Sequence, residues 1–118
     1  MANILVLDDV SASGVMIKRI LERKGHRVHV FSDEDEALQF AKTADIDLAV
    51  LDMKLRKMEG IEVLAELRKQ HPRIRGIMLT GYPTVDSANR AIAEGAAAYC
   101  VKPLDKAELE ETVAAVLV

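Results

Sequence analysis

The sequence predicts an α/β fold, a three-layer (βα)5 sandwich in which helices cover both faces of a five-stranded parallel sheet. Three observations predict it. Five short apolar segments recur along the 118 residues, stretches of helical length and period separate them, and no repeat, linker or low-complexity segment interrupts the alternation. Consecutive right-handed β-α-β units build a parallel sheet, for which we expect the strand order 2-1-3-4-5.

The predicted strands are short apolar segments at residues 3–7, 27–31, 47–51, 76–80 and 98–102. Four of them are continuous apolar runs, as expected of strands that are covered on both faces. The segment RVHVF at 27–31 alternates apolar and polar residues instead, which suits a strand at the edge of the sheet.

Each stretch between the strands carries one apolar face with helical spacing. Ile61, Leu64 and Leu67 mark that face in the third stretch, and the C-terminal stretch has a similar face. The expected N-caps are Ser11 or Ser13, Asp33, Thr84 and Asp105, and the expected helix stops are Gly25 and Gly95.

Composition and charge argue against several classes of protein. The formal net charge is -3 and no basic stripe is visible, so direct nucleic-acid binding is not expected. No apolar stretch approaches the ~20 residues that span a bilayer, and no signal-peptide pattern begins the chain, so we expect a cytoplasmic protein without a membrane partner. The single Cys100 lies in an apolar run and is expected in the core. The length fits one domain, residues 1–118.

Polar residues interrupt the apolar segments at the same end. Asp8 and Asp9 follow the first strand, and Asp52 follows the third. Thr80 closes the fourth strand, and Lys102 closes the fifth. Because the carboxyl ends of parallel strands share one edge, these side chains should converge where open α/β sheets bind their ligands.

The predicted strand order makes the first and third strands neighbours, so their three acids should form one pocket that Lys102 can reach. Each feature alone is ordinary, since an acidic pair before a helix is usually a cap or a solvated turn. Their coincidence at one edge favours a functional site. Crowded carboxylates need a compensating cation, and a site with few carboxylates, waters and an incoming phosphate suits Mg²⁺.

The chain resembles a response-regulator receiver domain, of the chemotaxis-regulator-like type, over essentially its whole length. The segments that carry this resemblance are LVLDDV, AVLDMKLRKMEGIEVL and IMLTGYPTVDSANRAIAEGAAAYCVKP. The resemblance implies a flavodoxin-like fold and a role in two-component signal transduction and phosphorelay. It also implies a signalling domain that is not an enzyme in its own right, although it promotes its own phosphotransfer and slow dephosphorylation.

By this resemblance, Asp52 is the phosphoacceptor. Asp8 and Asp9 join it in holding Mg²⁺, for which Mn²⁺ can substitute, and the backbone carbonyl of Lys54 completes the protein ligands. The resemblance makes Thr80 and Lys102 the pair that contacts the phosphoryl group.

The resemblance further implies a cis peptide bond between Lys102 and Pro103 and a switch made by Thr80 and Tyr99. The switch would alter the face of the fourth helix, the fifth strand and the fifth helix. The implied partners are a sensor histidine kinase or phosphotransfer protein, an output domain or target protein, and a second copy that dimerises through the switching face.

The chain departs from the usual receiver pattern in the loop after Asp52. Receivers usually carry Pro four residues after the phosphoacceptor, where this chain has Arg56 in the basic segment KLRK. We expect this difference to change loop stiffness or partner choice, although a merely solvated loop is the simpler interpretation. Lys54 and Tyr82 should flank the path of attacking water and slow self-hydrolysis of the phosphoaspartate.

Three other classes of protein fit the sequence less well. A haloacid-dehalogenase-type phosphatase needs a D-x-D arrangement after the first strand, which Asp8-Asp9-Val10 does not supply. A flavodoxin-like FMN binder needs a phosphate-binding loop after the first strand and flanking aromatic residues. The segment VSASG resembles such a loop only weakly, and the chain has no Trp. A receiver-like interaction module that works without phosphorylation is the remaining alternative, but such modules typically lack an acceptor or an acid.

Overall fold

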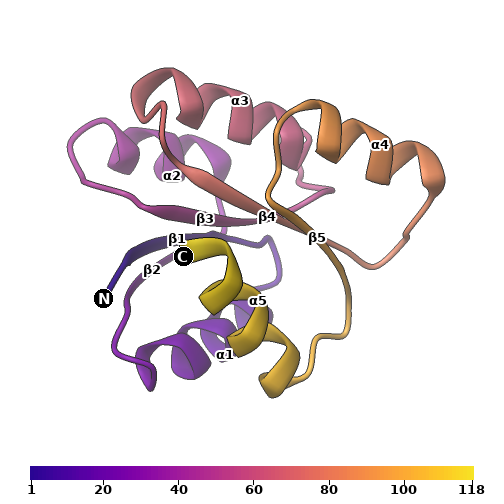
Figure 1. Cartoon of the computed structure of the whole chain (residues 1–118). Helices are drawn as coiled ribbons and strands as arrows, with labels where there is room; N and C mark the ends of the chain where they lie inside the picture. Colours follow the sequence, from indigo (N-terminus) through magenta and orange to yellow (C-terminus); the bar gives the residue numbers. More distant parts are fainter.

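The computed structural model describes all 118 residues, Met1–Val118, and confirms the predicted three-layer sandwich (Figure 1). The five parallel strands lie in the order β2-β1-β3-β4-β5, as predicted. The strands are β1 (Asn3–Leu7), β2 (Arg27–Phe31), β3 (Leu48–Asp52), β4 (Arg75–Thr80) and β5 (Ala98–Val101). The helices are α1 (Ser11–Glu22), α2 (Glu34–Ala41), α3 (Gly60–Gln70), α4 (Val85–Ala93) and α5 (Lys106–Leu117).

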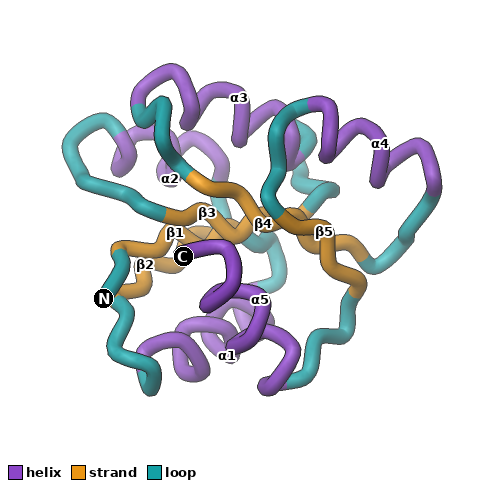
Figure 2. Tube along the Cα trace, in the orientation of Figure 1, coloured by secondary structure: helices purple, strands orange, loops and turns teal.

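The sheet separates two apolar cores, because successive side chains of a strand point to opposite faces. Helices α1 and α5 cover one face, and α2, α3 and α4 cover the other (Figure 2). In β1, Ile4 and Val6 belong to the core beneath α1 and α5, whereas Leu5 and Leu7 belong to the opposite core. The fully buried central strands therefore give the residues at their carboxyl ends a rigid support.

The strands at the two edges differ in their sequence pattern. The alternating segment of β2 does lie at one edge, as predicted, and its exposure is higher than that of β1 or β3. The other edge strand, β5, is a short apolar run that leaves Val101 exposed. None of the helices combines the length and apolar content that a membrane crossing requires.

Most of the predicted helix boundaries are confirmed. The side chains of Asp33, Thr84 and Asp105 each accept a hydrogen bond from the amide three residues later, as N-caps do. Gly25 and Gly95 both have φ of 89°, the left-handed conformation that ends a helix and that other residues adopt only at a cost.

The predicted N-cap of α1 is wrong. The helix begins at Ser11 after an N-cap at Val10, and no side chain makes a capping hydrogen bond, so neither Ser11 nor Ser13 has that role. Instead, Asp8 Oδ1 accepts a hydrogen bond from the Val10 amide at 2.9 Å. This Asx-type turn, closed by an acid of the predicted site, directs the chain from β1 into α1.

Candidate functional site

The predicted site residues meet at the carboxyl edge of the sheet. Asp8 directly follows β1, Asp52 ends β3, and Thr80 ends β4. These three belong to the only four buried polar or charged residues in the protein, with exposed fractions of 1%, 8% and 4%. Lys102 follows β5, and its amide donates a hydrogen bond to the Thr80 carbonyl at 2.7 Å. The peptide bond between Lys102 and Pro103 is cis.

The Lys102 ammonium group lies between two carboxylates. Its Nζ is 2.9 Å from Asp8 Oδ2 and 2.9 Å from Asp52 Oδ2. Asp8 and Asp52 come from adjacent strands, since Leu7 pairs with Leu51 in the parallel register. The lysine reaches them from the edge strand, so parallel topology and one long side chain bring together residues that are far apart in sequence.

Asp8, Asp9 and Asp52 form an oxygen-rich cluster whose chemistry fits a hard divalent cation. Each offers one carboxylate oxygen, and these three atoms lie within 4.8 Å of one another. Asp9 is only partly buried, whereas the other two carboxylates are buried. An all-oxygen donor set that is open to water on one side suits Mg²⁺, which usually keeps several of its water ligands in proteins.

Burial and ion pairing act in opposite directions on the charges of this site. Burial is the largest influence on Asp52 and raises the pKa of this carboxyl, because the hydrogen bond and charge of Lys102 offset it only in part. Burial also acts to lower the pKa of Lys102, but its hydrogen bonds to Asp52 and Asp8 outweigh it, and the net pKa is raised. The site therefore pairs a poorly solvated carboxylate with a firmly protonated ammonium group.

Thr80 is the last residue of β4, and its side chain contacts the segment that follows the strand. Its hydroxyl oxygen accepts a hydrogen bond from the Tyr82 amide at 3.0 Å. The Tyr82 side chain is 76% exposed, and the Lys54 Nζ lies 5.5 Å from the centre of its ring. The Lys54 amide donates to Asp52 Oδ1 at 3.2 Å. The two residues predicted to flank the path of water thus form a cation–π pair beside Asp52.

Gly60 is a residue of this region that sequence reasoning missed. A Cβ at this position would collide with the backbone carbonyl of Asp52 and would lie 2.9 Å from the terminal methyl of Met78. The Gly60 amide donates to the Met53 carbonyl at 2.9 Å. Helix α3 therefore begins directly against the end of β3, and only glycine permits this approach. The cue in the sequence is a glycine that stands at a helix start rather than at a stop.

Tyr99 lies outside the acidic cluster. Its hydroxyl is 2.5 Å from the Ser87 hydroxyl on α4, and its ring packs at the margin of the core beneath α2, α3 and α4. Arg90, one turn further along α4, makes a two-pronged ion pair at 2.9 Å with Glu59. Helix α4 is thus joined both to β5 and to the loop that follows Asp52.

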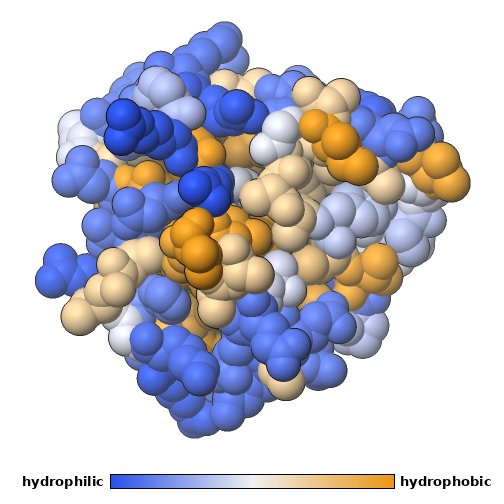
Figure 3. All heavy atoms as spheres, in the orientation of Figure 1, coloured by the Kyte–Doolittle hydropathy of each residue, from blue (hydrophilic) through white to orange (hydrophobic).

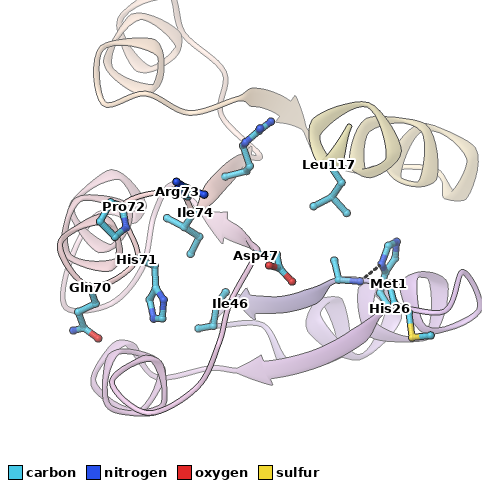
Figure 4. Close-up of a pocket in the computed structure, with 12 residues that line it drawn as sticks. Met1, His26, Ile46, Asp47, Gln70, His71, Pro72, Arg73, Ile74 and Leu117 are labelled. Atoms are coloured by element: carbon cyan, nitrogen blue, oxygen red, sulfur yellow. Dashed lines mark hydrogen bonds between the residues drawn. The ribbon is translucent and has the colours of Figure 1, made fainter.

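A separate cavity of about 670 Å³ lies at the amino edge of the sheet and contains none of the predicted site residues (Figure 4). Polar side chains around it bond to backbone groups. His26 accepts from the Ala2 amide at 3.2 Å, Asp47 accepts from the Asn3 amide at 2.8 Å, and Arg75 donates to the Val116 carbonyl at 2.7 Å. These contacts join the starts of strands to neighbouring segments, which is a structural role.

Comparison with known proteins decides the family. The family model of the response regulator receiver domain matches residues 4–114. The chain belongs to this family. Receiver domains of response regulators act in two-component signalling, so the chain is a signalling domain of that kind, and its α/β sandwich is the fold of its solved relatives.

Two relatives are transcriptional regulatory proteins. The receiver is 33% identical over 115 residues to ZraR of Klebsiella oxytoca, covering 98% of this chain and 26% of that protein. It is 38% identical over 114 residues to the alkaline phosphatase synthesis regulator PhoP of Bacillus subtilis, covering 97% of this chain and 48% of that protein. The chain thus spans about a quarter to a half of the length of these relatives.

Solved structures agree with this assignment. A CheY-like receiver domain protein from Methanospirillum hungatei has a TM-score of 0.93 and 33% identity, with 99% of this chain and 94% of that chain covered. A response regulator from Burkholderia pseudomallei has a TM-score of 0.87 and 31% identity, with 100% of this chain and 67% of that chain covered. The latter structure contains a phosphorylated aspartic acid, a calcium ion and citrate.

Proposed function

We propose that this receiver domain accepts a phosphoryl group on Asp52 from the phosphohistidine of a sensor kinase or phosphotransfer protein. One observation carries the proposal. Asp52 is a buried carboxylate at a strand end, and one of its oxygens is 2.9 Å from Lys102 Nζ. The related structure with a phosphorylated aspartic acid supports the same chemistry on this fold.

In the proposed transfer, an oxygen of Asp52 attacks phosphorus as the phosphorus–nitrogen bond of the donor breaks. The imidazole nitrogen keeps the bonding electrons and leaves. Negative charge spreads over the three transferring oxygens, so catalysis is mainly positioning and neutralisation. Lys102 would neutralise part of that charge, and its raised pKa keeps it protonated for this role. The Thr80 hydroxyl would contact another oxygen of the group.

The residues that would hold Mg²⁺ are Asp8, Asp9, Asp52 and the backbone carbonyl of Lys54, and Mn²⁺ can substitute. When bound, the ion would supply positive charge that relieves repulsion between the carboxylates and attracts phosphoryl oxygens. The cluster of three carboxylate oxygens within 4.8 Å supports this assignment. Asp8 also has a structural role, because its Oδ1 accepts the hydrogen bond from the Val10 amide that closes the turn into α1.

Signalling would follow from a shift of Thr80 toward the phosphoryl group and a matching rotamer change of Tyr99. The surface that would change is formed by α4, β5 and α5. Its exposed apolar side chains include Val85, Ile92 and Val101, which are 80%, 69% and 44% exposed. Apolar side chains are visible over α4 and β5 on this face in Figure 3. Such a surface suits an output domain, a target protein or a second receiver.

We infer that residues 1–118 act as one receiver domain and that its output is control of transcription. The transcriptional regulatory proteins among the relatives support this inference. The control would be exerted through an attached or separate module, since the formal net charge of -3 gives this domain no general attraction for nucleic acid.

The decisive experiment exposes the protein to acetyl phosphate and Mg²⁺ and measures intact mass. We expect the parent protein to gain one phosphoryl group, the Asp52→Asn variant to gain none, and an Asp45→Asn control at an exposed position to behave like the parent. Phosphorylation of the Asp52→Asn variant to the same extent, or none in the parent protein, would contradict the proposal. The latter result would favour an interaction module that works without phosphate.

A further inference from the structure

The loop between β3 and α3 carries Lys54 and is held at its base by its own backbone. The Gly60 amide donates to the Met53 carbonyl at 2.9 Å, and Lys54 pairs with Glu59 in an isolated antiparallel bridge. The tip of the loop, residues 55–58, makes no backbone hydrogen bond within the loop. The amides of Lys57 and Met58 at that tip take their partner from α2 instead.

That partner is Glu34, the first residue of α2. One of its carboxylate oxygens accepts hydrogen bonds from both amides, at 3.0 Å in the case of Met58. Glu34 is 1% exposed, and the other buried polar or charged residues of the protein all belong to the proposed phosphoryl site. A buried carboxylate is costly unless it is bonded, so its place here calls for a reason beyond surface charge.

Helix capping does not supply that reason. The N-cap of α2 is Asp33, whose side chain accepts the hydrogen bond from the Glu36 amide. An acid that served only the positive end of the helix dipole could remain in water, as the neighbouring Asp35 does with a side chain that is 74% exposed. Glu34 instead crosses from α2 to a loop that follows a different strand.

A second set of contacts joins the same two segments. The Lys57 ammonium group lies 2.9 Å from Asp33 Oδ1 and 2.8 Å from Asp35 Oδ2. These ion pairs are exposed and therefore weak, because water screens them and ordering long side chains costs entropy. The buried hydrogen bonds from the Lys57 and Met58 amides to the Glu34 carboxylate are the stronger contact. Removing this carboxylate would leave both amides without a hydrogen-bond acceptor.

We propose that Glu34 is a positioning residue for the phosphoryl site. By fixing the loop tip through the Lys57 and Met58 amides, it holds Lys54 against Asp52 in the arrangement that favours metal binding and phosphoryl uptake. The inference rests on the proposed function, because it assigns a distant support to that same site.

The test compares Glu34→Ala with Asp35→Ala, a control that removes only an exposed ion pair. In metal-free protein, the Lys57 and Met58 amides should exchange hydrogen about tenfold faster in Glu34→Ala and at the parent rate in the control. The Kd for Mg²⁺, measured by calorimetry, should rise about tenfold in Glu34→Ala, the lower end of the effect that residues supporting metal ligands usually have. The rate of phosphorylation by acetyl phosphate at fixed Mg²⁺ should fall by a similar factor.

A second variant, Val113→Ala, tests whether a general loss of stability alone weakens Mg²⁺ binding. It removes buried methyl groups from α5, on the opposite side of the sheet from Glu34. This variant should lose stability and keep the Mg²⁺ affinity of the parent. If Glu34→Ala loses amide protection but keeps the parent Kd, the proposal is overturned. Should Glu34→Ala fail to fold, Glu34→Gln replaces it; a Kd at least about twofold above the parent supports the proposal, and an unchanged Kd rejects it.

The Mg²⁺ measurement also separates this inference from the proposed function. A parent protein that binds Mg²⁺ but gains no phosphoryl group would contradict the proposed function, whereas the Kd of Glu34→Ala for Mg²⁺ relative to the parent would still decide the role of Glu34.

Discussion

Asp52 combines two properties that oppose one another. Burial makes its carboxylate poorly solvated, and the resulting rise in pKa is only partly offset by Lys102. Poor solvation is useful in a group that attacks phosphorus, but it destabilises the folded protein while the group is ionised. The cost should be measurable in the metal-free protein.

We therefore expect Asp52→Asn to raise the Tm of the metal-free protein at pH 7 by a few degrees. The pKa of Asp52 is raised in the folded state, so the folded protein holds this proton more tightly than the unfolded chain. The penalty for ionisation is complete above the raised pKa, shrinks as the pH falls through it, and is gone below the ordinary pKa of the unfolded chain. The advantage of the variant should accordingly shrink in acid.

Thermal unfolding monitored by circular dichroism from neutral to acidic pH checks this expectation, with Asp45→Asn as an exposed control that should leave the Tm unchanged. A Tm below that of the parent at pH 7 would mean that the ion pair with Lys102 outweighs the cost of burial.

Lys54 and Tyr82 lead to a prediction about the lifetime of the phosphoaspartate. The Lys54 Nζ lies 5.5 Å from the centre of the Tyr82 ring, and the Lys54 amide donates to Asp52, so we expect this pair to hinder the approach of water to a phosphoaspartate. The Lys54→Asn, Tyr82→Glu double variant should hydrolyse its phosphoryl group severalfold faster than the parent. Decay of the phosphorylated mass after removal of acetyl phosphate measures this, and an unchanged half-life would contradict it.

Residues of the strand ends could be predicted because each polar side chain terminates an apolar run. Glu34 could not be predicted in the same way. In the segment SDEDE it has acidic neighbours on both sides, and local sequence does not distinguish it from Asp35 or Glu36. Its burial depends on where the tip of a distant loop lies, and that is a property of the folded chain.

Among the elements, the strands and most helix caps follow from local pattern, whereas the start of α3 depends on tertiary contact. Gly60 stands where the helix meets the backbone of β3, and its lack of a Cβ permits that contact. The failed prediction of a serine cap on α1 has a related cause. Asp8 already closes the turn through the Val10 amide, so the chain enters the helix without a capping side chain.

Gly60→Ala should destabilise the protein by about 3 kcal/mol, because overpacked sites must move backbone or side chains apart. The added methyl would displace the Asp52 carbonyl, and phosphorylation should slow as well. Gly81→Ala is the matched control, since nothing lies within 4 Å of a Cβ there and its stability should be close to that of the parent. Urea unfolding at equilibrium measures both, and equal midpoints for the two variants would show that the close approach at Gly60 is not a constraint.

If the acidic cluster binds a divalent cation as proposed, metal binding and folding of the whole domain should be linked. Asp8 and Asp9 are neighbours in the chain, but only folding brings Asp52 to within 4.8 Å of them, so a divalent cation should bind the folded state far more tightly than the unfolded chain. Mg²⁺ at tenfold its Kd should then stabilise the protein by about 1.4 kcal/mol. For a domain of this size that corresponds to a Tm increase of roughly 5 °C, and a chelator should reverse it.

Asp9 is the best residue with which to test this linkage. It is the most exposed of the three acids, and no hydrogen bond or ion pair of its side chain supports the metal-free fold. Asp9→Asn should therefore keep or slightly raise the metal-free Tm, because one of the repelling charges is removed, and should lose most of the increase with Mg²⁺, in scans of both proteins with Mg²⁺ or chelator. A variant that still gains the full increase would place the cation away from the carboxyl edge of the sheet, and the proposed role of that edge in phosphoryl uptake would fail with it.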